Sequence, residues 1–132
     1  LVLQDDNLII RLAGESSFVS GSDQVRPAFR ELLGRIGSEI ESSSGKIRIE
    51  GHTDNVKIAF SDRFRSNWDL SSARSSSVGG ILLRDVGIDL DRLVVAGYAD
   101  SRPIESNDSA QGRAANRRIE IIVRGSSEAV SQ

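Results

Sequence analysis

The residue types best suited to chemistry gather in one short polar run, Gly51-His-Thr-Asp-Asn55. This run holds the only histidine of the chain, His52, close to Asp54. A histidine oriented by an aspartate can act as the general base of a serine hydrolase. The chain has many serines but no Gly-x-Ser-x-Gly string, the sharp turn that exposes the nucleophile of α/β-hydrolases. We therefore expect no enzyme activity and a structural role for His52, and a Ser-His-Asp hydrolase is the weaker alternative.

The composition excludes several other kinds of site. The absence of cysteine excludes disulfides, thiol nucleophiles and cysteine-bound metals, and a single histidine excludes a multi-histidine metal site within one chain. We therefore expect no cofactor and no metal. The net charge of −2 and the lack of an aromatic platform with interleaved basic residues argue against nucleic acid as a partner.

The length of 132 residues, with 38% hydrophobic and 27% charged residues, is typical of one globular domain. We expect this domain over residues 1–124, with residues 1–25 as a strand and loop extension that can rearrange, and a disordered tail at 125–132. No apolar run approaches the roughly 20 residues that a membrane helix needs. Because the chain has no methionine, we expect a processed product or a piece of a longer protein, with any membrane segment upstream of Leu1.

Hydrophobic periodicity predicts two helices. Apolar residues recur at helical spacing over residues 26–42. A second helix is expected from about residue 68, with Asn67 or Asp69 as its N-cap and Gly87 as its end.

Alternating or compact apolar runs predict the strands. They are expected at residues 1–3 and 8–12 (a hairpin or one bent strand), 46–50, 93–98 and 117–124, with loops at 13–24, 55–66 and 100–112. The order β-α-β-α-β-β predicts an α+β fold: a two-layer sandwich in which both helices cover one face of a mixed four-stranded sheet.

Four strings carry a resemblance to a known family. They are Phe18-Val-Ser-Gly-Ser22, Gly51-His-Thr-Asp-Asn55, Ser66-Asn-Trp-Asp-Leu-Ser-Ser-Ala-Arg74 and Asn116-Arg-Arg-Ile-Glu120. In this order they resemble the OmpA-like peptidoglycan-binding domain over about residues 8–124. The string that begins at Ser66, with the long loop before it, is most similar to the periplasmic domain of the flagellar stator B subunit (MotB, or its sodium-driven relative PomB). Inner-membrane OmpA-like proteins of type VI secretion share these features.

The resemblance implies a non-catalytic wall anchor that holds the diaminopimelate of a peptidoglycan stem peptide in a cleft. The positions that match the family's ligand-binding set are Asp54, Arg74, Asn67, Arg117 and Thr53, with the loop at Ser20-Gly21 lining the same cleft. One departure is that the outer-membrane branch usually has a glycine soon after its aspartate, where this chain continues Asn55-Val-Lys-Ile58.

The chemistry of diaminopimelate suits these residue types. Its side chain ends in an ammonium and a carboxylate on one carbon, so its site needs an anion and a fork-shaped cation. Asp54 can accept from the ammonium, and Arg74 can bind the carboxylate bidentately, which lysine cannot reproduce. The simpler interpretation of Arg74 is an exposed helix arginine paired with Asp54 or Asp69.

Two further residues have open alternatives. Trp68 is expected to pack at the start of its helix, with a platform for a sugar ring as the alternative. Arg117 and Arg118 point to opposite faces of a strand, and we expect Arg117 to face the cleft and Arg118 to face solvent.

The full expectation is a periplasmic domain that anchors an inner-membrane ion-channel complex to the cell wall for flagellar motility. Its partners would be peptidoglycan, a second copy in a homodimer, and a channel-forming subunit bound through an upstream membrane segment. The alternatives are a wall anchor of type VI secretion or another envelope complex, or a dimerisation domain that uses the Gly79-Gly80 helix face. Paired glycines inside a helix indicate close packing against a neighbour.

Overall fold

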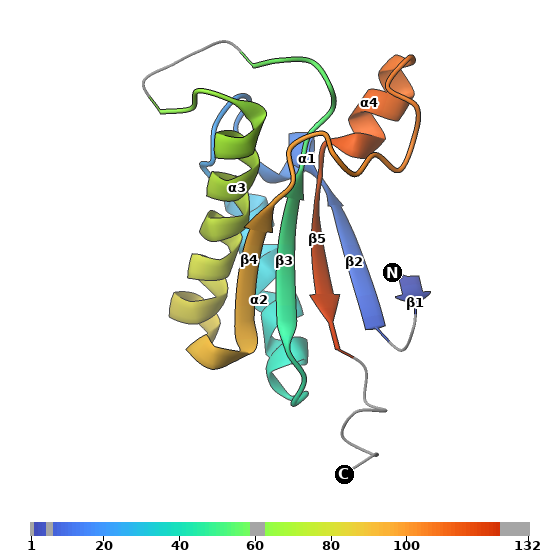
Figure 1. The fold of residues 1–132 in the computed structure, drawn as a ribbon. Helices are drawn as coiled ribbons and strands as arrows, with labels where there is room; N and C mark the ends of the chain where they lie inside the picture. The colour runs from blue at the N-terminus through green and yellow to red at the C-terminus, as the bar shows by residue number, and fades with distance from the viewer. Residues whose placement is uncertain (1, 5–6, 59–62, 125–132) are drawn as a thin grey trace.

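The computed structural model describes residues 2–4, 7–58 and 63–124. Its centre is one mixed sheet with the strand order β1-β2-β5-β3-β4 (Figure 1). The strands are β1 (Val2–Gln4), β2 (Asn7–Ala13), β3 (Ile47–His52), β4 (Leu93–Gly97) and β5 (Arg118–Val123). The β3–β4 pair is parallel and the other pairs are antiparallel. The predicted α+β class and mixed sheet are confirmed, and the hairpin at the N-terminus adds the short strand β1 beside the four expected ones.

Two long helices cover one face of this sheet (Figure 1). They are α2 (Pro27–Glu41) and α3 (Asn67–Ile81), and α3 continues into a wider π-helical turn over Leu82–Val86. Gly87 ends that turn as predicted, with a φ of 83° that favours glycine. The N-cap of α3 is neither Asn67 nor Asp69, since the hydroxyl of Ser66 accepts from the Asp69 backbone N–H. The expected caps already lie inside the first turn.

The hydrophobic core lies between the helices and the sheet. Its most buried members come from both layers: Leu33, Ile47, Ile49, Val78, Leu82, Ile119 and Ile121. The close packing expected at Gly79 is present, because a Cβ there would lie 2.8 Å from Val95 Cγ1. No helix in the described part of the chain is long and apolar enough to cross a membrane.

Two short helices fall in segments predicted as loops. They are α1 (Gly14–Ser17), a single turn, and α4 (Ala110–Asn116). The segment of α4 has no apolar stripe, so periodicity could not reveal it. It is held by polar contacts instead: the hydroxyl of Ser109 caps it, and the Asn116 side chain binds the backbone of Ile104 and Glu105. The predicted disordered tail and residues 59–62 of the predicted loop lie outside the described residues.

A glycine on β3 allows α3 to approach the polar run. A Cβ on Gly51 would lie 2.2 Å from the backbone oxygen of Ser71 in α3. We expect Gly51→Ala to lower the free energy of unfolding by about 1–3 kcal/mol, because backbone must move to make room. In α2, nothing lies within 4 Å of a Cβ on Gly34, so Gly34→Ala should raise stability by about 0.5–1 kcal/mol. Urea unfolding of both variants checks this, and equal effects would contradict it.

Candidate functional site

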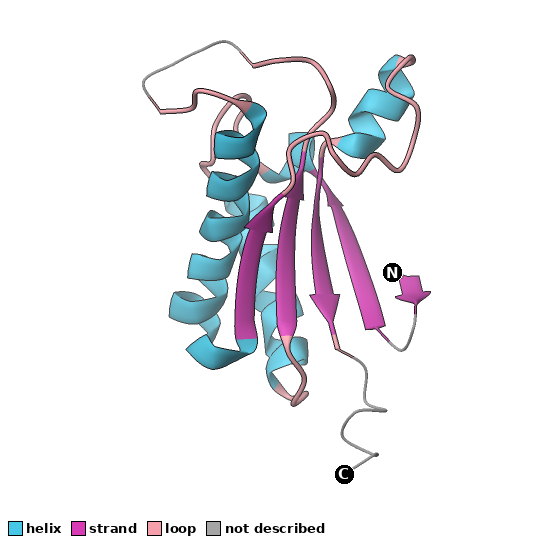
Figure 2. Cartoon of the chain, in the orientation of Figure 1, coloured by secondary structure: helices cyan, strands magenta, loops and turns pink. Residues whose placement is uncertain are grey.

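The polar run lies at the end of the sheet where β3 finishes and β5 begins. Because β3 and β5 are antiparallel, Asp54 after β3 and Arg117 before β5 meet at this end. Arg117 Nη1 donates to Asp54 Oδ2 at 2.6 Å, and Asp54 Oδ1 accepts from the Val56 backbone N–H at 3.0 Å. The start of α3 and the loops around it gather at the same end (Figure 2). Folding therefore brings together two of the predicted site residues that are far apart in sequence.

Arg117 is held by acidic groups on two sides. Its other terminal nitrogen, Nη2, donates to the carboxylate of Glu15 in α1. The hydrogen bond to Asp54 raises the pKa of the Arg117 guanidinium, burial lowers it in part, and Glu15 raises it again. Arg117 therefore stays charged and is shared between the carboxylates of Asp54 and Glu15. No sequence signal marked Glu15, since α1 was expected as a loop.

Arg74 reaches the same region from α3, but its guanidinium has different partners from that of Arg117. Its Nε donates to the Ser22 backbone oxygen at 2.8 Å, and its guanidinium carbon lies 4.8 Å from the centre of the Phe18 ring. It forms no ion pair with the described residues, so the pairing with Asp54 or Asp69 considered from the sequence is not present. Burial lowers the pKa of Arg74, the charge of Asp23 offsets this in part, and Arg117 lowers it further. A partly desolvated cation without a paired carboxylate is chemically suited to bind an anion.

Both arginines open onto one cavity of about 380 Å³, here called the arginine cavity. Its lining residues are Gly14, Glu15, Phe18, Ser20, Gly21, Arg26, Ile58, Leu70, Arg74 and Arg117. The Ser20-Gly21 loop predicted for the cleft lines it. Arg26 is a third cation there that the sequence analysis did not single out. Three arginines, one glutamate and the apolar side chains of Phe18, Ile58 and Leu70 therefore share the lining of the arginine cavity.

The remaining predicted site residues lie on or beside the turn that follows β3. Asp54 is buried and its carboxylate faces Arg117. The Thr53 hydroxyl donates to the Asp54 backbone oxygen at 2.8 Å. The Asn67 amide donates to the Val56 backbone oxygen at 3.0 Å and lies 3.5 Å from that of Asp54. Thr53 and Asn67 thus brace the turn that follows β3, and none of the three lines the arginine cavity.

A second cavity of about 370 Å³, here called the tryptophan cavity, adjoins the first and shares Ile58 with it. Its lining residues are Asn55, Lys57, Ile58, Arg65, Ser66, Asn67, Trp68, Ala99 and Asp100. Trp68 is 53% exposed, so the expectation that it packs at the helix start is wrong. The first turn of α3 extends past the end of β4 (Figure 1), where no strand can cover it.

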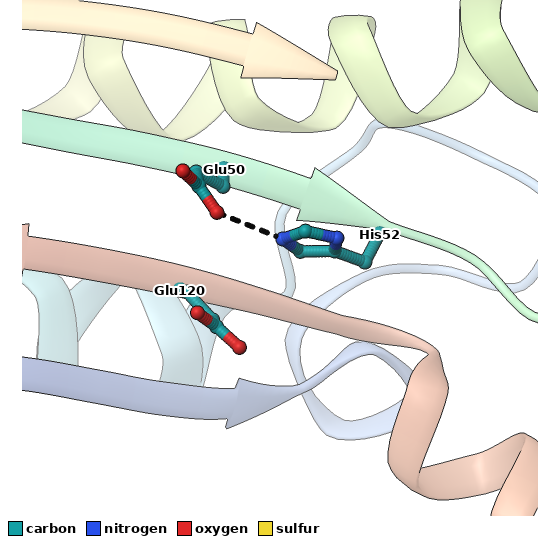
Figure 3. A group of neighbouring side chains, drawn as sticks. All are labelled: Glu50, His52 and Glu120. Atoms are coloured by element: carbon teal, nitrogen blue, oxygen red, sulfur yellow. Dashed lines mark hydrogen bonds and ion pairs between the residues drawn. The ribbon is translucent and has the colours of Figure 1, made fainter. Parts of the chain in front are cut away.

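The face of the sheet opposite the long helices carries a separate charged group, Glu50, His52 and Glu120 (Figure 3). Arg118 shares this face and pairs with Glu120 at 2.6 Å, and because its side chain is buried, the expectation that it faces solvent is wrong. Arg11 also pairs with Glu120, and Arg48 pairs with Glu50 at 2.8 Å. Because the carboxylates already bind arginines, we interpret the group as a structural ion network, although its ligand atoms lie within 4.8 Å of one another.

His52 belongs to this network and lies away from both cavities. Its Nε2 is 3.1 Å from Glu50 Oε1, and its ring stacks on Tyr98 at 5.3 Å between centroids. Neither ring nitrogen contacts a serine hydroxyl among the described residues. This arrangement fits the structural role expected for His52.

The network predicts an acid-dependent loss of stability. Burial tends to raise the pKa of Glu50, but hydrogen bonds from His52 and Arg48 outweigh it, so the pKa lies below its ordinary value of 4.5. A depressed carboxyl pKa stabilises the fold above the unfolded-state value, and this contribution disappears as the pH falls through the lower folded value. We expect Glu50→Gln to unfold with a shallower pH dependence below about pH 4.5 than the native chain. Thermal unfolding from pH 3 to 7 checks this, and the exposed Glu39→Gln is the control; parallel curves for all three proteins would refute it.

Comparisons with known proteins agree with this architecture. Residues 17–117 match the OmpA family. Motility protein B of Bacillus subtilis (strain 168) is 33% identical over 129 residues, which cover 96% of this chain and 49% of that protein. The chain thus spans about half the length of this relative.

Solved structures agree as well. The cell wall anchor of the T6SS from Pseudomonas aeruginosa superposes with a TM-score of 0.85 at 37% identity, over 94% of this chain and 87% of that one. The periplasmic domain of Helicobacter pylori MotB gives 0.82 at 26% identity, over 97% and 82%. The fold, the matched residues and these relatives lead to one conclusion: the chain belongs to the OmpA family.

Proposed function

We propose that this chain is a non-catalytic cell wall anchor that binds the diaminopimelate of peptidoglycan stem peptides in the arginine cavity. The observation that carries the proposal is Arg74, a partly buried guanidinium that faces a cavity without an ion-pair partner among the described residues. A carboxylate that binds it bidentately would remove the cost of leaving that charge desolvated. Relatives that include a T6SS cell wall anchor support the same role.

The ammonium of diaminopimelate would reach Asp54 by displacing Arg117, since Asp54 itself does not line the arginine cavity. In the free protein this carboxylate pairs with Arg117 Nη1, and Arg117 Nη2 pairs with the carboxylate of Glu15. A ligand that carries both charges can exchange partners with this internal chain of ion pairs: its ammonium replaces Arg117 at Asp54, and its carboxylate joins Arg117 and Arg74. Thr53 and Asn67 would act indirectly, by holding the turn that presents Asp54.

Co-sedimentation with purified diaminopimelate-type sacculi tests the proposal. We expect the native chain to pellet with the sacculi, and the folded Arg74→Ala and Asp54→Ala variants to remain in the supernatant. Arg35→Ala, which removes an exposed arginine of α2, is the matched control and should pellet like the native chain. Failure of the folded native chain to pellet would refute wall binding.

Glu15 should compete with the ligand for Arg117. Its side chain is 70% exposed, so its ion pair with Arg117 is partly screened and easily given up. We expect Glu15→Gln to bind a diaminopimelate tetrapeptide about two- to fivefold more tightly, because the competing carboxylate is gone. Titration calorimetry checks this, with Glu31→Gln in α2 as a control of similar exposure. Weaker binding by Glu15→Gln would mean that Glu15 contributes to the site instead.

For the wider role we propose the periplasmic end of a stator B subunit, in which an upstream membrane segment joins a channel-forming partner of a flagellar motor. Motility protein B of Bacillus subtilis and the Helicobacter pylori MotB domain support this assignment. The T6SS anchor, at 37% identity, favours a secretion complex as the second candidate. Two such domains on a homodimer would bind a polymeric wall more tightly than one, and sedimentation velocity on the chain tests for the dimer.

A further inference from the structure

We propose that the tryptophan cavity is a glycan subsite, in which a sugar ring of peptidoglycan stacks on Trp68 while the attached stem peptide occupies the arginine cavity. This inference rests on the proposed function and names a second part of the same ligand. It assigns a role to Trp68, which is not part of the hydrophobic core and does not line the arginine cavity.

The exposure of Trp68 is the first observation. Tryptophan is highly buried on average in folded proteins, yet Trp68 as a residue is 53% exposed beside a cavity. Its ring N–H has no hydrogen-bond partner among the residues that the structure describes. The side chain therefore offers an apolar face and a free donor together, which matches the apolar C–H face and the polar rim of a pyranose ring.

The lining of the cavity is the second observation. Around the indole, polar groups come from the turn after β3, the start of α3 and the turn after β4: Asn55, Lys57, Arg65 and Asp100. An amide, two cations and a carboxylate surround one aromatic face. Such groups can donate hydrogen bonds to, and accept them from, the hydroxyl and N-acetyl groups of an amino sugar. A few polar groups around an apolar surface are the usual composition of a small-ligand site.

The position of the cavity is the third observation. It adjoins the arginine cavity through the shared Ile58. In a stem peptide, two residues lie between diaminopimelate and the sugar-bearing end, and these two alone span roughly 7 Å of extended chain. A ligand with diaminopimelate at Arg74 therefore has its sugar within reach of a neighbouring cavity, so one muropeptide can fill both.

The test compares two probes: a diaminopimelate tetrapeptide without sugars, and the same peptide on its disaccharide. Because Trp68 is the only tryptophan of the chain, its fluorescence reports directly on the subsite. We expect the disaccharide-peptide, and not the free peptide, to shift or quench the emission. We expect Trp68→Ala to weaken binding of the disaccharide-peptide about three- to tenfold, to leave the free peptide unchanged, and Trp68→Phe to restore most of the loss.

The outcomes separate this inference from the proposed function. If the native chain binds both probes equally and the emission does not respond to the sugar, the glycan subsite is refuted and the wall anchor stands. An equal loss for both probes in Trp68→Ala would also refute the subsite, since it would indicate a structural role. If the folded native chain binds neither probe, the proposed function fails and the subsite fails with it.

Discussion

Replacing Arg74 by alanine should weaken binding of a diaminopimelate tetrapeptide by about 100-fold or more. Each charge-assisted hydrogen bond contributes roughly 1.5–3 kcal/mol, and a bidentate contact contributes two of them. Arg74→Lys keeps the positive charge but loses the fork, so we expect it to recover only a small part of the affinity. Titration calorimetry measures all three proteins.

Two controls make this result specific. Arg35→Ala removes an arginine whose side chain is 75% exposed on α2, and its affinity should stay within about twofold of native. Because Arg74 also lies over the Phe18 ring, circular dichroism and thermal unfolding should establish that the Arg74 variants remain folded. Native affinity in folded Arg74→Lys would mean that charge alone, and not a bidentate contact, recognises the ligand.

A tetrapeptide with lysine in place of diaminopimelate should bind about 100-fold more weakly to the native chain. Lysine keeps the ammonium for Asp54 but lacks the carboxylate, so the guanidinium of Arg74 would be enclosed without a partner. The penalty arises from that unpaired charge, and it should therefore disappear when the charge is removed.

A double comparison tests this cause. We expect Arg74→Ala to bind the two peptides with similar, weak affinity, so that the discrimination found in the native chain is lost. Competition of both peptides against one labelled diaminopimelate probe measures the ratio for each protein. If Arg74→Ala still prefers the diaminopimelate peptide strongly, then Arg117 or Arg26 in the same cavity carries the selectivity instead.

Much of the fold was predictable from local patterns. The apolar stripe of residues 26–42 corresponds to α2, and the alternation in residues 117–124 corresponds to β5. Periodicity reports which face of an element is buried, and burying these faces against one another requires a sheet with helices on one side. The meeting of Asp54 and Arg117 did not follow from these patterns, because it depends on β5 lying beside β3 and antiparallel to it.

The features that periodicity could not reveal are stabilised by hydrogen bonds from individual polar side chains. The helix α4 depends on Ser109 and Asn116, and Ser66 caps α3. Such contacts need one side chain in one orientation, and they leave no repeating pattern in the sequence. A search for short helices by apolar spacing therefore passes over them.

The sequence by itself determined the layers of this protein, its lack of thiol chemistry, and the residue types that resemble a wall-binding site. Only the tertiary structure decided how those residues are used. It pairs Asp54 with Arg117, leaves Arg74 without an ion pair among the described residues, and exposes Trp68 beside a second cavity. The physical reason is that pairing, desolvation and exposure depend on groups distant in sequence, which become neighbours only when the sheet and α3 pack together.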